Sequence, residues 1–235
     1  MPAFDDPSQQ LDCFQWPLQP AEPAPRAMRR LRLAVMASGE GSNFEALTLA
    51  CRADRPPADM ALLVVNNPAC GARERAERLG VPCRLIDHRL QPSREALDAA
   101  LISAFQEAQV DLVVMAGWMR IVTPRLVQAF PERLVNIHPS LLPSFRGMDA
   151  VGQALAAGVR LAGCTAHLVN EEVDAGRILV QAAVPVLDGD DHASLTARIQ
   201  LQEHRILPLA VRLAAQRLGL PGDPGTAAGL GPLED

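Results

Sequence analysis

From about residue 31 to about residue 216, short β-rich runs alternate with longer Ala- and Leu-rich segments whose apolar residues follow helical spacing. Repeated strand-helix units of this kind are typical of a parallel sheet covered by helices. The alternation therefore predicts an α/β fold, with a mostly parallel, twisted sheet and helices on both faces. A chain of 235 residues can bury a core of that size without a metal or a disulfide staple.

The apolar pattern also gives approximate bounds for the individual elements. Ser93 is predicted to cap the helix that follows it, and Pro124 suits a first helical turn. Strands are expected over residues 31–37, 60–65, 83–86, 111–115, 134–137, 164–169 and 178–184. Helices are expected over residues 43–52, 71–79, 93–108, 124–129, 150–157 and 194–216.

The two ends of the chain differ from the middle in composition. Residues 1–28 contain six prolines and show no sustained periodicity, and residues 218–235 are rich in proline and glycine. Such segments offer little apolar surface to pack. We expect both ends to be disordered extensions of one folded domain over residues 29–217.

The charge balance argues against two classes of partner. Lys and Arg number 22 against 27 Asp and Glu, and the net charge of -5 has the wrong sign for general attraction to nucleic acid or to an anionic membrane. No apolar run approaches the roughly 20 residues that span a bilayer, and Asp5 and Asp6 stand where a secretion signal would be basic. We expect a cytoplasmic protein with no nucleic-acid partner and no membrane partner, whose oligomeric state is unknown.

The cysteines and histidines do not suggest a metal site. The five cysteines are scattered, with no C-x-x-C pair, so neither a disulfide framework nor a thiolate zinc site is indicated. The histidines and carboxylates form no cluster with ligand spacing, and His167 in particular is expected to be structural. The sequence therefore predicts chemistry that requires no metal.

A glycine-containing loop, S-G-E-G-S-N at residues 38–43, follows the first predicted strand and precedes a helix. The amides of Gly41, Ser42 and Asn43 could point at an anion beside the positive end of that helix. Phe44 occupies the place of the third glycine of a dinucleotide fingerprint, and no lysine follows to make a Walker loop. Taken alone, the loop fits equally well a monophosphate site and an ordinary strand-to-helix turn capped by Ser or Asn.

The segment L-V-N-I-H-P-S-L-L-P-S-F-R-G, residues 134–147, is the richest in chemistry. Asn136 and His138 are two residues apart at the end of a predicted strand, so their side chains leave the same face. An amide can hydrogen-bond an oxygen that becomes negative, and an imidazole can donate a proton near neutral pH. The pair therefore suits carbonyl chemistry, although N-x-H alone more often marks a hydrogen-bonded strand end.

Six separate blocks of sequence, in the same order along the chain, resemble the phosphoribosylglycinamide formyltransferases. The resemblance covers about residues 31–213. Other folate-dependent formyltransferases share the N-x-H and a later Asp, whereas the glycine loop and the Q-E-H block favour this family. The blocks are S-G-E-G-S-N (38–43), S-R-E-A (93–96), A-G-W-M-R-I (116–121), N-I-H-P-S-L-L-P (136–143), E-E-V-D-A-G (171–176) and Q-E-H-R-I-L-P (202–208).

The resemblance implies a Rossmann-like formyltransferase fold and a defined reaction. A formyl group moves from 10-formyltetrahydrofolate, the cosubstrate, to the amine of 5-phosphoribosylglycinamide, a step of purine (IMP) biosynthesis. The family pattern places Asn136 and His138 at the developing oxyanion, with His138 as the proton donor. Asp174 then lies close to His138, where its charge favours the protonated imidazole.

The family pattern also assigns binding residues. Arg94, Asn136 and the run Met119, Arg120, Ile121 and Val122 match positions that contact folate, the arginines being suited to its carboxylates. The substrate's phosphate and ribose would be held by Gly41, Ser42, Asn43, Gln200 and Glu203.

The chain departs from the common family pattern at two places. Arg177 replaces a proline that often follows the glycine after the late Asp, and residues 148–152 replace a stretch that carries histidine in many members. Neither departure removes the Asn-His-Asp set, but both leave loop shape and substrate affinity open.

Three alternative functions are disfavoured by the sequence. A methionyl-tRNA formyltransferase is disfavoured because the core is followed only by a short Pro/Gly-rich tail, and a formyltetrahydrofolate hydrolase because residues 1–28 are too short for a regulatory domain. A catalytically silent sugar-phosphate or folate sensor is disfavoured by the retained Asn136, His138 and Asp174.

Overall fold

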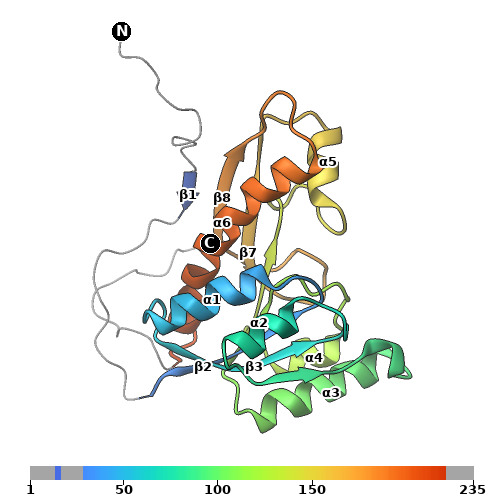
Figure 1. The fold of residues 1–235 in the computed structure, drawn as a ribbon, viewed down its shortest axis with the longest axis vertical. Helices are drawn as coiled ribbons and strands as arrows, with labels where there is room; N and C mark the ends of the chain where they lie inside the picture. The colour runs from blue at the N-terminus through green and yellow to red at the C-terminus, as the bar shows by residue number, and fades with distance from the viewer. Residues whose placement is uncertain (1–13, 17–28, 221–235) are drawn as a thin grey trace.

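The computed structural model describes residues 14–16 and 29–220, which form one eight-stranded sheet with helices on both faces (Figure 1). The strand order is β1-β8-β7-β6-β5-β2-β3-β4. The strands are β1 (Phe14–Trp16), β2 (Leu31–Ala37), β3 (Ala58–Val65), β4 (Cys83–Leu85), β5 (Leu112–Met115), β6 (Leu134–His138), β7 (Leu161–Leu168) and β8 (Ile178–Pro185).

The sheet has a parallel half and an antiparallel half. Strands β2 to β6 run parallel to one another, which confirms the predicted mostly parallel sheet. By contrast, β7 pairs antiparallel with both β6 and β8, and β1 pairs antiparallel with β8. The sequence pattern did not predict this reversal, because an apolar run specifies a buried strand but not its direction.

The helices divide between the two faces according to which core they share. Helices α1 (Ser42–Arg52), α2 (Ala72–Arg78), α5 (Ala150–Ala156) and α6 (His192–Arg217) pack on one face, and α3 (Arg94–Glu107) and α4 (Pro124–Ala129) on the other. Strand β2 shows why both faces must be covered. Leu33 and Val35 pack into the core on the side of α1 and α6, and Ala34 and Met36 pack into the core on the side of α3 and α4. A single 3₁₀ turn, His88–Leu90, precedes α3. Within the described residues, no helix combines the length and apolarity needed to cross a membrane.

The observed elements agree closely with those expected from the sequence. All seven expected strands and six expected helices are present, with ends that differ by three residues or fewer. Ser93 caps α3 by accepting from the amide of Ala96 at 3.1 Å, and Pro124 stands in the first turn of α4. These matches follow from local signals: apolar period, a capping hydroxyl and a proline that has no amide to lose.

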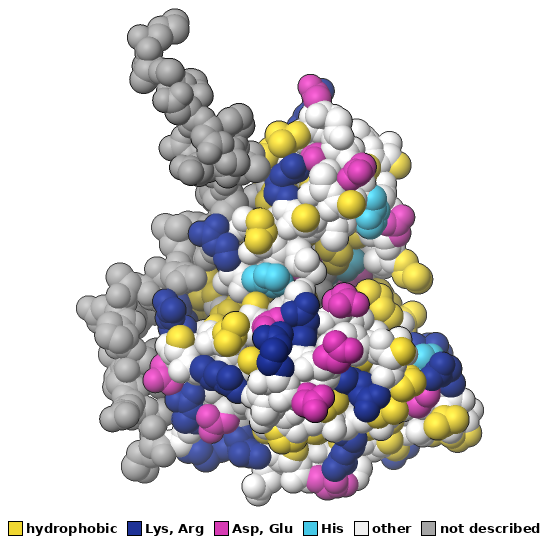
Figure 2. Space-filling model, in the orientation of Figure 1, with side chains coloured by type: hydrophobic (Ala, Val, Ile, Leu, Met, Phe, Trp, Pro, Cys, Tyr) yellow, Lys and Arg dark blue, Asp and Glu magenta, His cyan; other side chains and the backbone are white. Residues whose placement is uncertain are grey.

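The ends of the chain are only partly described. Strand β1 lies within the stretch expected to be a disordered extension, and it adds an edge strand to the sheet. The rest of residues 1–28 and residues 221–235 lie outside the described residues. Leu218 and Leu220, which fall in the expected second extension, pack against the core. The surface shown in Figure 2 carries acidic and basic side chains interspersed.

Candidate active site

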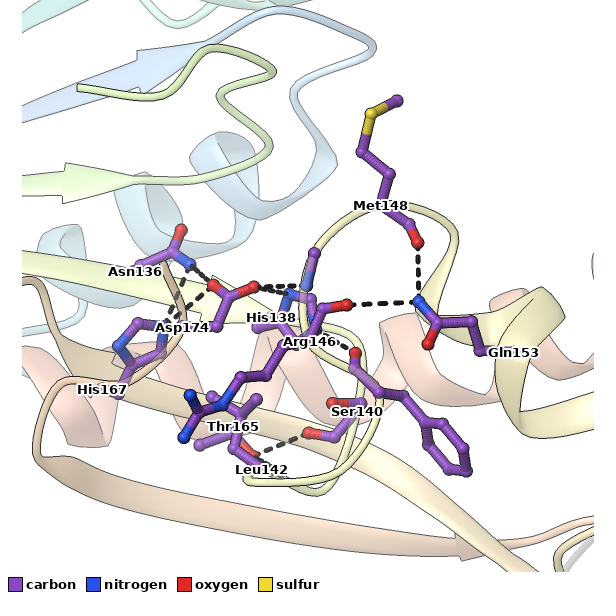
Figure 3. Close-up of polar contacts among 12 residues, drawn as sticks. Asn136, His138, Ser140, Leu142, Arg146, Met148, Gln153, Thr165, His167 and Asp174 are labelled. Carbon is purple, nitrogen blue, oxygen red and sulfur yellow. Dashed lines mark hydrogen bonds and ion pairs between the residues drawn. The ribbon is translucent and has the colours of Figure 1, made fainter. Parts of the chain in front are cut away.

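The site lies at the carboxyl end of β6, where the sheet changes from parallel to antiparallel. Asn136 and His138 lie on one face of β6, as their spacing predicts, and Asn136 stands directly opposite His167 in the register with β7. Asp174 reaches the same place from the loop between β7 and β8 (Figure 3). The backbone of Asp174 has a positive φ of 51°, an uncommon conformation for a residue with a side chain.

His138 is buried and both of its ring nitrogens face oxygen acceptors. Nδ1 lies 3.4 Å from Oδ2 of Asp174, and Nε2 lies 2.9 Å from the carbonyl oxygen of Phe145. These two acceptors, one at each ring nitrogen, fix the orientation of the imidazole.

Asp174 is held by donors on several sides. Its Oδ2 accepts from the amide of Gly147 at 2.8 Å, and its Oδ1 lies 3.4 Å from Nδ2 of Asn136 and 3.6 Å from Nε2 of His167. Burial acts to raise the pKa of Asp174, but the nearby imidazole of His167, the Gly147 amide and the charge of His138 together hold that pKa below its ordinary value. The carboxyl is therefore ionised near neutral pH.

His167 belongs to this cluster, although it was expected to be only structural. Its Nδ1 donates to the carbonyl of Leu168 at 2.8 Å, and its Nε2 lies 3.1 Å from Nδ2 of Asn136. In a neutral ring, Nε2 then accepts from the Asn136 amide and fixes its orientation. The sequence contained no signal for this contact, because it depends on the antiparallel register between β6 and β7.

The side-chain amide of Asn136 is already engaged in this arrangement. One Nδ2 hydrogen faces His167 at 3.1 Å and the other faces Asp174 at the long distance of 3.4 Å. In Figure 3 the side-chain oxygen points away from both partners. An oxyanion could therefore receive a hydrogen bond from Nδ2 only at the expense of the weaker contact, the one with Asp174.

The loop after β6 is braced from β7. The hydroxyl of Thr165 donates to the carbonyl of Ser140 at 2.7 Å and accepts from the amide of Leu142 at 3.0 Å. The hydroxyl of Ser140 in turn donates to the carbonyl of Ser144 at 2.6 Å. These buried and part-buried bonds fix the route of the chain towards Phe145, whose carbonyl meets His138.

The glycine loop opens α1 through its backbone rather than through a side-chain cap. Gly41 is the N-cap, with φ of 76° and no side-chain hydrogen bond, so the alternative of a Ser or Asn cap is not observed. A Cβ at Gly41 would lie 2.7 Å from Cβ of Ala72 in α2, so glycine is required by both backbone angle and space. The free amides of the first turn of α1 remain suited to an anion.

Two polar residues of α6 lie against this loop. Nε2 of Gln200 donates to the hydroxyl of Ser42 at 2.9 Å, and Nδ2 of Asn43 donates to Oε2 of Glu203 at 2.7 Å. Burial raises the pKa of Glu203, while the Asn43 bond acts in the opposite direction. The structure thus brings four of the sequence-predicted substrate residues together although about 160 positions separate them in the chain.

The predicted folate segment, Met119 to Val122, is anchored at both ends. The amide of Met119 donates to the hydroxyl of Ser38 at 3.0 Å. At the other end, the amide and hydroxyl of Thr123 donate to buried Asp98 at 2.6 and 2.7 Å. Met119 and Ile121 are mostly exposed between these anchors, and Arg94 is exposed at the start of α3. The segment therefore presents apolar side chains on a fixed backbone beside the glycine loop.

No arrangement within residues 14–16 and 29–220 brings three or more His, Cys, Asp or Glu side chains together as a metal site. The groups available for chemistry at the end of β6 are an imidazole, a carboxylate and an amide. They can move a proton and stabilise a negative oxygen.

Comparison with known proteins gives a consistent result over the folded part of the chain. The formyl transferase family model matches residues 31–211. The chain is 39% identical over 189 residues to the phosphoribosylglycinamide formyltransferase of Bacillus subtilis (strain 168), covering 80% of this chain and 95% of that protein. It is 44% identical over 187 residues to the human trifunctional purine biosynthetic protein adenosine-3, covering 80% of this chain but only 18% of that protein.

The solved structures agree with these relatives. Glycinamide ribonucleotide transformylase 1 from Symbiobacterium toebii is 47% identical and superimposes with a TM-score of 0.78, over 80% of this chain and 89% of that chain.

Proposed function

Because the chain belongs to the formyl transferase family, we propose that it transfers the formyl group of 10-formyltetrahydrofolate to the amine of 5-phosphoribosylglycinamide. The products are formylglycinamide ribonucleotide and tetrahydrofolate. The observation that carries the proposal is the buried group at the end of β6, in which the ring of His138 lies between Asp174 and a backbone carbonyl. Sequence similarity and site chemistry support the same reaction.

The reaction needs a stabilised oxyanion. The neutral amine attacks the formyl carbon, a C–N bond forms, and the formyl oxygen becomes negative in the tetrahedral intermediate. Nδ2 of Asn136 would donate to that oxygen with the hydrogen that now makes the 3.4 Å contact to Asp174, keeping its 3.1 Å contact with His167. A donor already oriented before the reaction loses little free energy to reorganisation.

The reaction also needs a proton at the leaving nitrogen. As the intermediate collapses, the bond between the formyl carbon and N10 of the folate breaks and N10 takes a proton, while the attacking amine loses one. His138 would supply the proton to N10 and recover one from the amine, directly or through water. Its Nε2 bond to Phe145 must open for this transfer, whereas Asp174 keeps the charged ring in place.

The phosphate and ribose of the glycinamide substrate would occupy the space between the glycine loop and α6. The first-turn amides of α1, from Gly41 to Asn43, would hold the phosphate. Gln200 and Glu203 would hold the ribose hydroxyls, since both already bond to side chains of that loop. The hydrogen bonds between the glycine loop and α6 support this placement of the substrate.

The folate would lie along the anchored segment between β5 and α4. Met119, Ile121 and Val122 offer apolar contacts and backbone groups to the pterin, and Arg94 and Arg120 offer charge to the carboxylates. The side chain of Asn136 would contact the formyl group of the folate. No metal is needed for any of these contacts, and a cytoplasmic location without nucleic-acid or membrane partners remains our prediction.

The deciding experiment is a formyl-transfer assay with the full chain. Purified protein is mixed with 10-formyltetrahydrofolate and 5-phosphoribosylglycinamide, and tetrahydrofolate and formylated product are measured together. We expect equal amounts of both, and little tetrahydrofolate when the glycinamide substrate is omitted. Release of formate without acceptor would instead indicate a hydrolase, transfer to methionyl-tRNA a different acceptor, and no turnover by folded protein a silent binding module.

A further inference from the structure

Gln153, in the first turn of α5, lies beside the loop that follows β6 and does not touch the side chains of Asn136, His138 or Asp174. Its Nε2 donates to two carbonyl oxygens of that loop, those of Arg146 at 3.2 Å and Met148 at 2.8 Å (Figure 3). These two carbonyls flank Gly147, whose amide donates to Asp174 at 2.8 Å. One side chain therefore holds the backbone on both sides of the residue that contacts the catalytic carboxylate.

The geometry of the peptide bond links the two sets of contacts. The carbonyl of Arg146 and the amide of Gly147 belong to the same planar unit, and in a trans peptide they point in opposite directions. Holding the carbonyl towards Gln153 therefore directs the N–H towards Asp174. We propose that Gln153 is a positioning residue that keeps the Gly147 amide on Asp174 and so keeps Asp174 placed for its contact with His138.

The loop needs such a restraint because its backbone is unusual. Phe145, Gly147 and Asp149 all have positive φ, at 56°, 79° and 54°. Glycine at position 147 makes rotation of the Arg146–Gly147 peptide easy, since it carries no Cβ to oppose it. Rotation by half a turn would present the carbonyl oxygen to the ionised Asp174, which is repulsive.

Gln153 is itself fixed by the start of α5. Its amide donates to the carbonyl of Asp149 at 2.9 Å, and the side chain of Asp149 accepts from the amide of Gly152 at 3.2 Å. The glutamine is exposed, so water competes for both carbonyls when its amide is removed. We therefore expect a moderate effect from its loss, on the order of 3- to 10-fold, as for a typical net hydrogen bond.

The groups that face Asp174 determine the expected direction of a change with pH. His138 comes from β6 and His167 from β7, and the nearby Arg146 is paired with Glu172 at 2.8 Å. The Gly147 amide bonds the ionised carboxylate, so its loss moves the pKa of Asp174 up towards the ordinary value. Activity that requires ionised Asp174 would then fall off at a higher pH on the acid side.

The first test reads the amide directly and does not depend on activity. In the isotope-labelled full chain, the Gly147 amide proton is followed by NMR while the pH is varied. In Gln153→Met, which keeps the length but removes the donor, we expect its resonance to move upfield and its titration midpoint to rise. In the matched control Gln128→Met, which removes an exposed 3.1 Å bond to Glu171, it should not change. An unchanged Gly147 resonance in Gln153→Met overturns the proposal.

The second test uses kinetics and rests on the proposed function. Gln153→Met should lower kcat about 3- to 10-fold with KM values little changed, and should move the acid limb of the pH profile upward. In an Asp174→Asn background the same substitution should lower kcat less than about 2-fold, because the carboxylate on which it acts is gone. An equal loss in both backgrounds contradicts the proposal. A parent chain without formyl transfer contradicts the proposed function instead, and the NMR result still decides the role of Gln153.

Discussion

The parallel and antiparallel halves of the sheet contribute to the site in different ways. In the parallel half, loops that leave β2 and β5 present backbone amides and exposed apolar side chains, as at Gly41 and Met119. Where β6 meets β7, the groups are buried side chains whose contacts run across the strands, as between Asn136 and His167. The difference suggests that one half holds the substrates and the other performs the proton chemistry.

This division can be tested because the two halves should affect different kinetic constants. Loss of a group that touches only the transition state lowers kcat, whereas loss of a group that binds substrate and transition state equally raises KM. Substitutions at the end of β6 should therefore lower kcat. Those in the loops after β2 and β5 should raise the KM of one substrate at a time.

A large effect is expected at Asn136. Asn136→Ala removes the proposed oxyanion donor, and loss of one such donor lowers kcat by about 100-fold or more. Both KM values should change little. The measurement is steady-state kinetics with both substrates varied, and circular dichroism checks the fold. A variant that loses substrate affinity but keeps kcat would move Asn136 into the binding half.

The next effect in size is expected in the glycine loop. Gly41→Ala places a Cβ against Ala72 and on a backbone with positive φ, so the amides of α1 should shift away from the phosphate. We expect the KM of the glycinamide substrate to rise roughly 10-fold, which corresponds to about 1.4 kcal/mol, with the folate KM unchanged.

Gly39→Ala is the matched control for that loop. A Cβ at Gly39 meets nothing within 4 Å, so the protein itself should tolerate it. If both variants weaken both substrates equally, the loop has a general structural role and no local phosphate site.

A smaller effect is expected at the folate end. Arg94 is exposed, so water screens its charge and its contact with a folate carboxylate is modest. Arg94→Ala should raise the folate KM about 3-fold, in line with an exposed ion pair, and leave the glycinamide KM and kcat unchanged. The salt dependence of the folate KM should also become weaker. A strong salt dependence that survives the substitution would exclude Arg94 as the folate contact.

The smallest effect concerns the pH dependence of stability at Glu203. Burial raises the pKa of Glu203 above its ordinary value. The protonated carboxyl therefore makes its full contribution to the free energy of unfolding below the ordinary pKa, and that contribution is lost as the pH rises through the folded-state pKa. The glutamine of Glu203→Gln cannot ionise. The Tm of the variant, measured relative to that of the wild type, should therefore rise by roughly a few degrees as the pH is raised from 4 to 8. Parallel Tm curves for the two proteins would show that the pKa of Glu203 is not raised in the folded state.

The features that could be predicted from the sequence are those set by local signals. The apolar periods gave every expected strand and helix, and the two-residue spacing of Asn136 and His138 placed both on one face. His167 was missed because its contact depends on strand register. The contact between Phe145 and His138 was missed because a backbone carbonyl has no signature in the sequence.

The antiparallel direction of β7 was missed for a related reason. Its apolar side chains are buried whichever way it runs, so burial alone does not distinguish the two directions. The glycine loop was only half predicted: its place between a strand and a helix was foreseen, but the close approach of Gly41 to Ala72 depends on how α2 packs against α1.

On the proposed function, His138 and Asp174 act as one unit in proton transfer. This claim is tested most directly by a double-mutant cycle on kcat, with both substrates saturating and every variant checked by circular dichroism. We expect His138→Ala and Asp174→Asn each to lower kcat substantially, His138→Ala by about 10²- to 10⁴-fold, and the double variant to be little slower than the slower single variant. A near-normal kcat in folded His138→Ala, or losses that multiply fully in the double variant, would contradict the account.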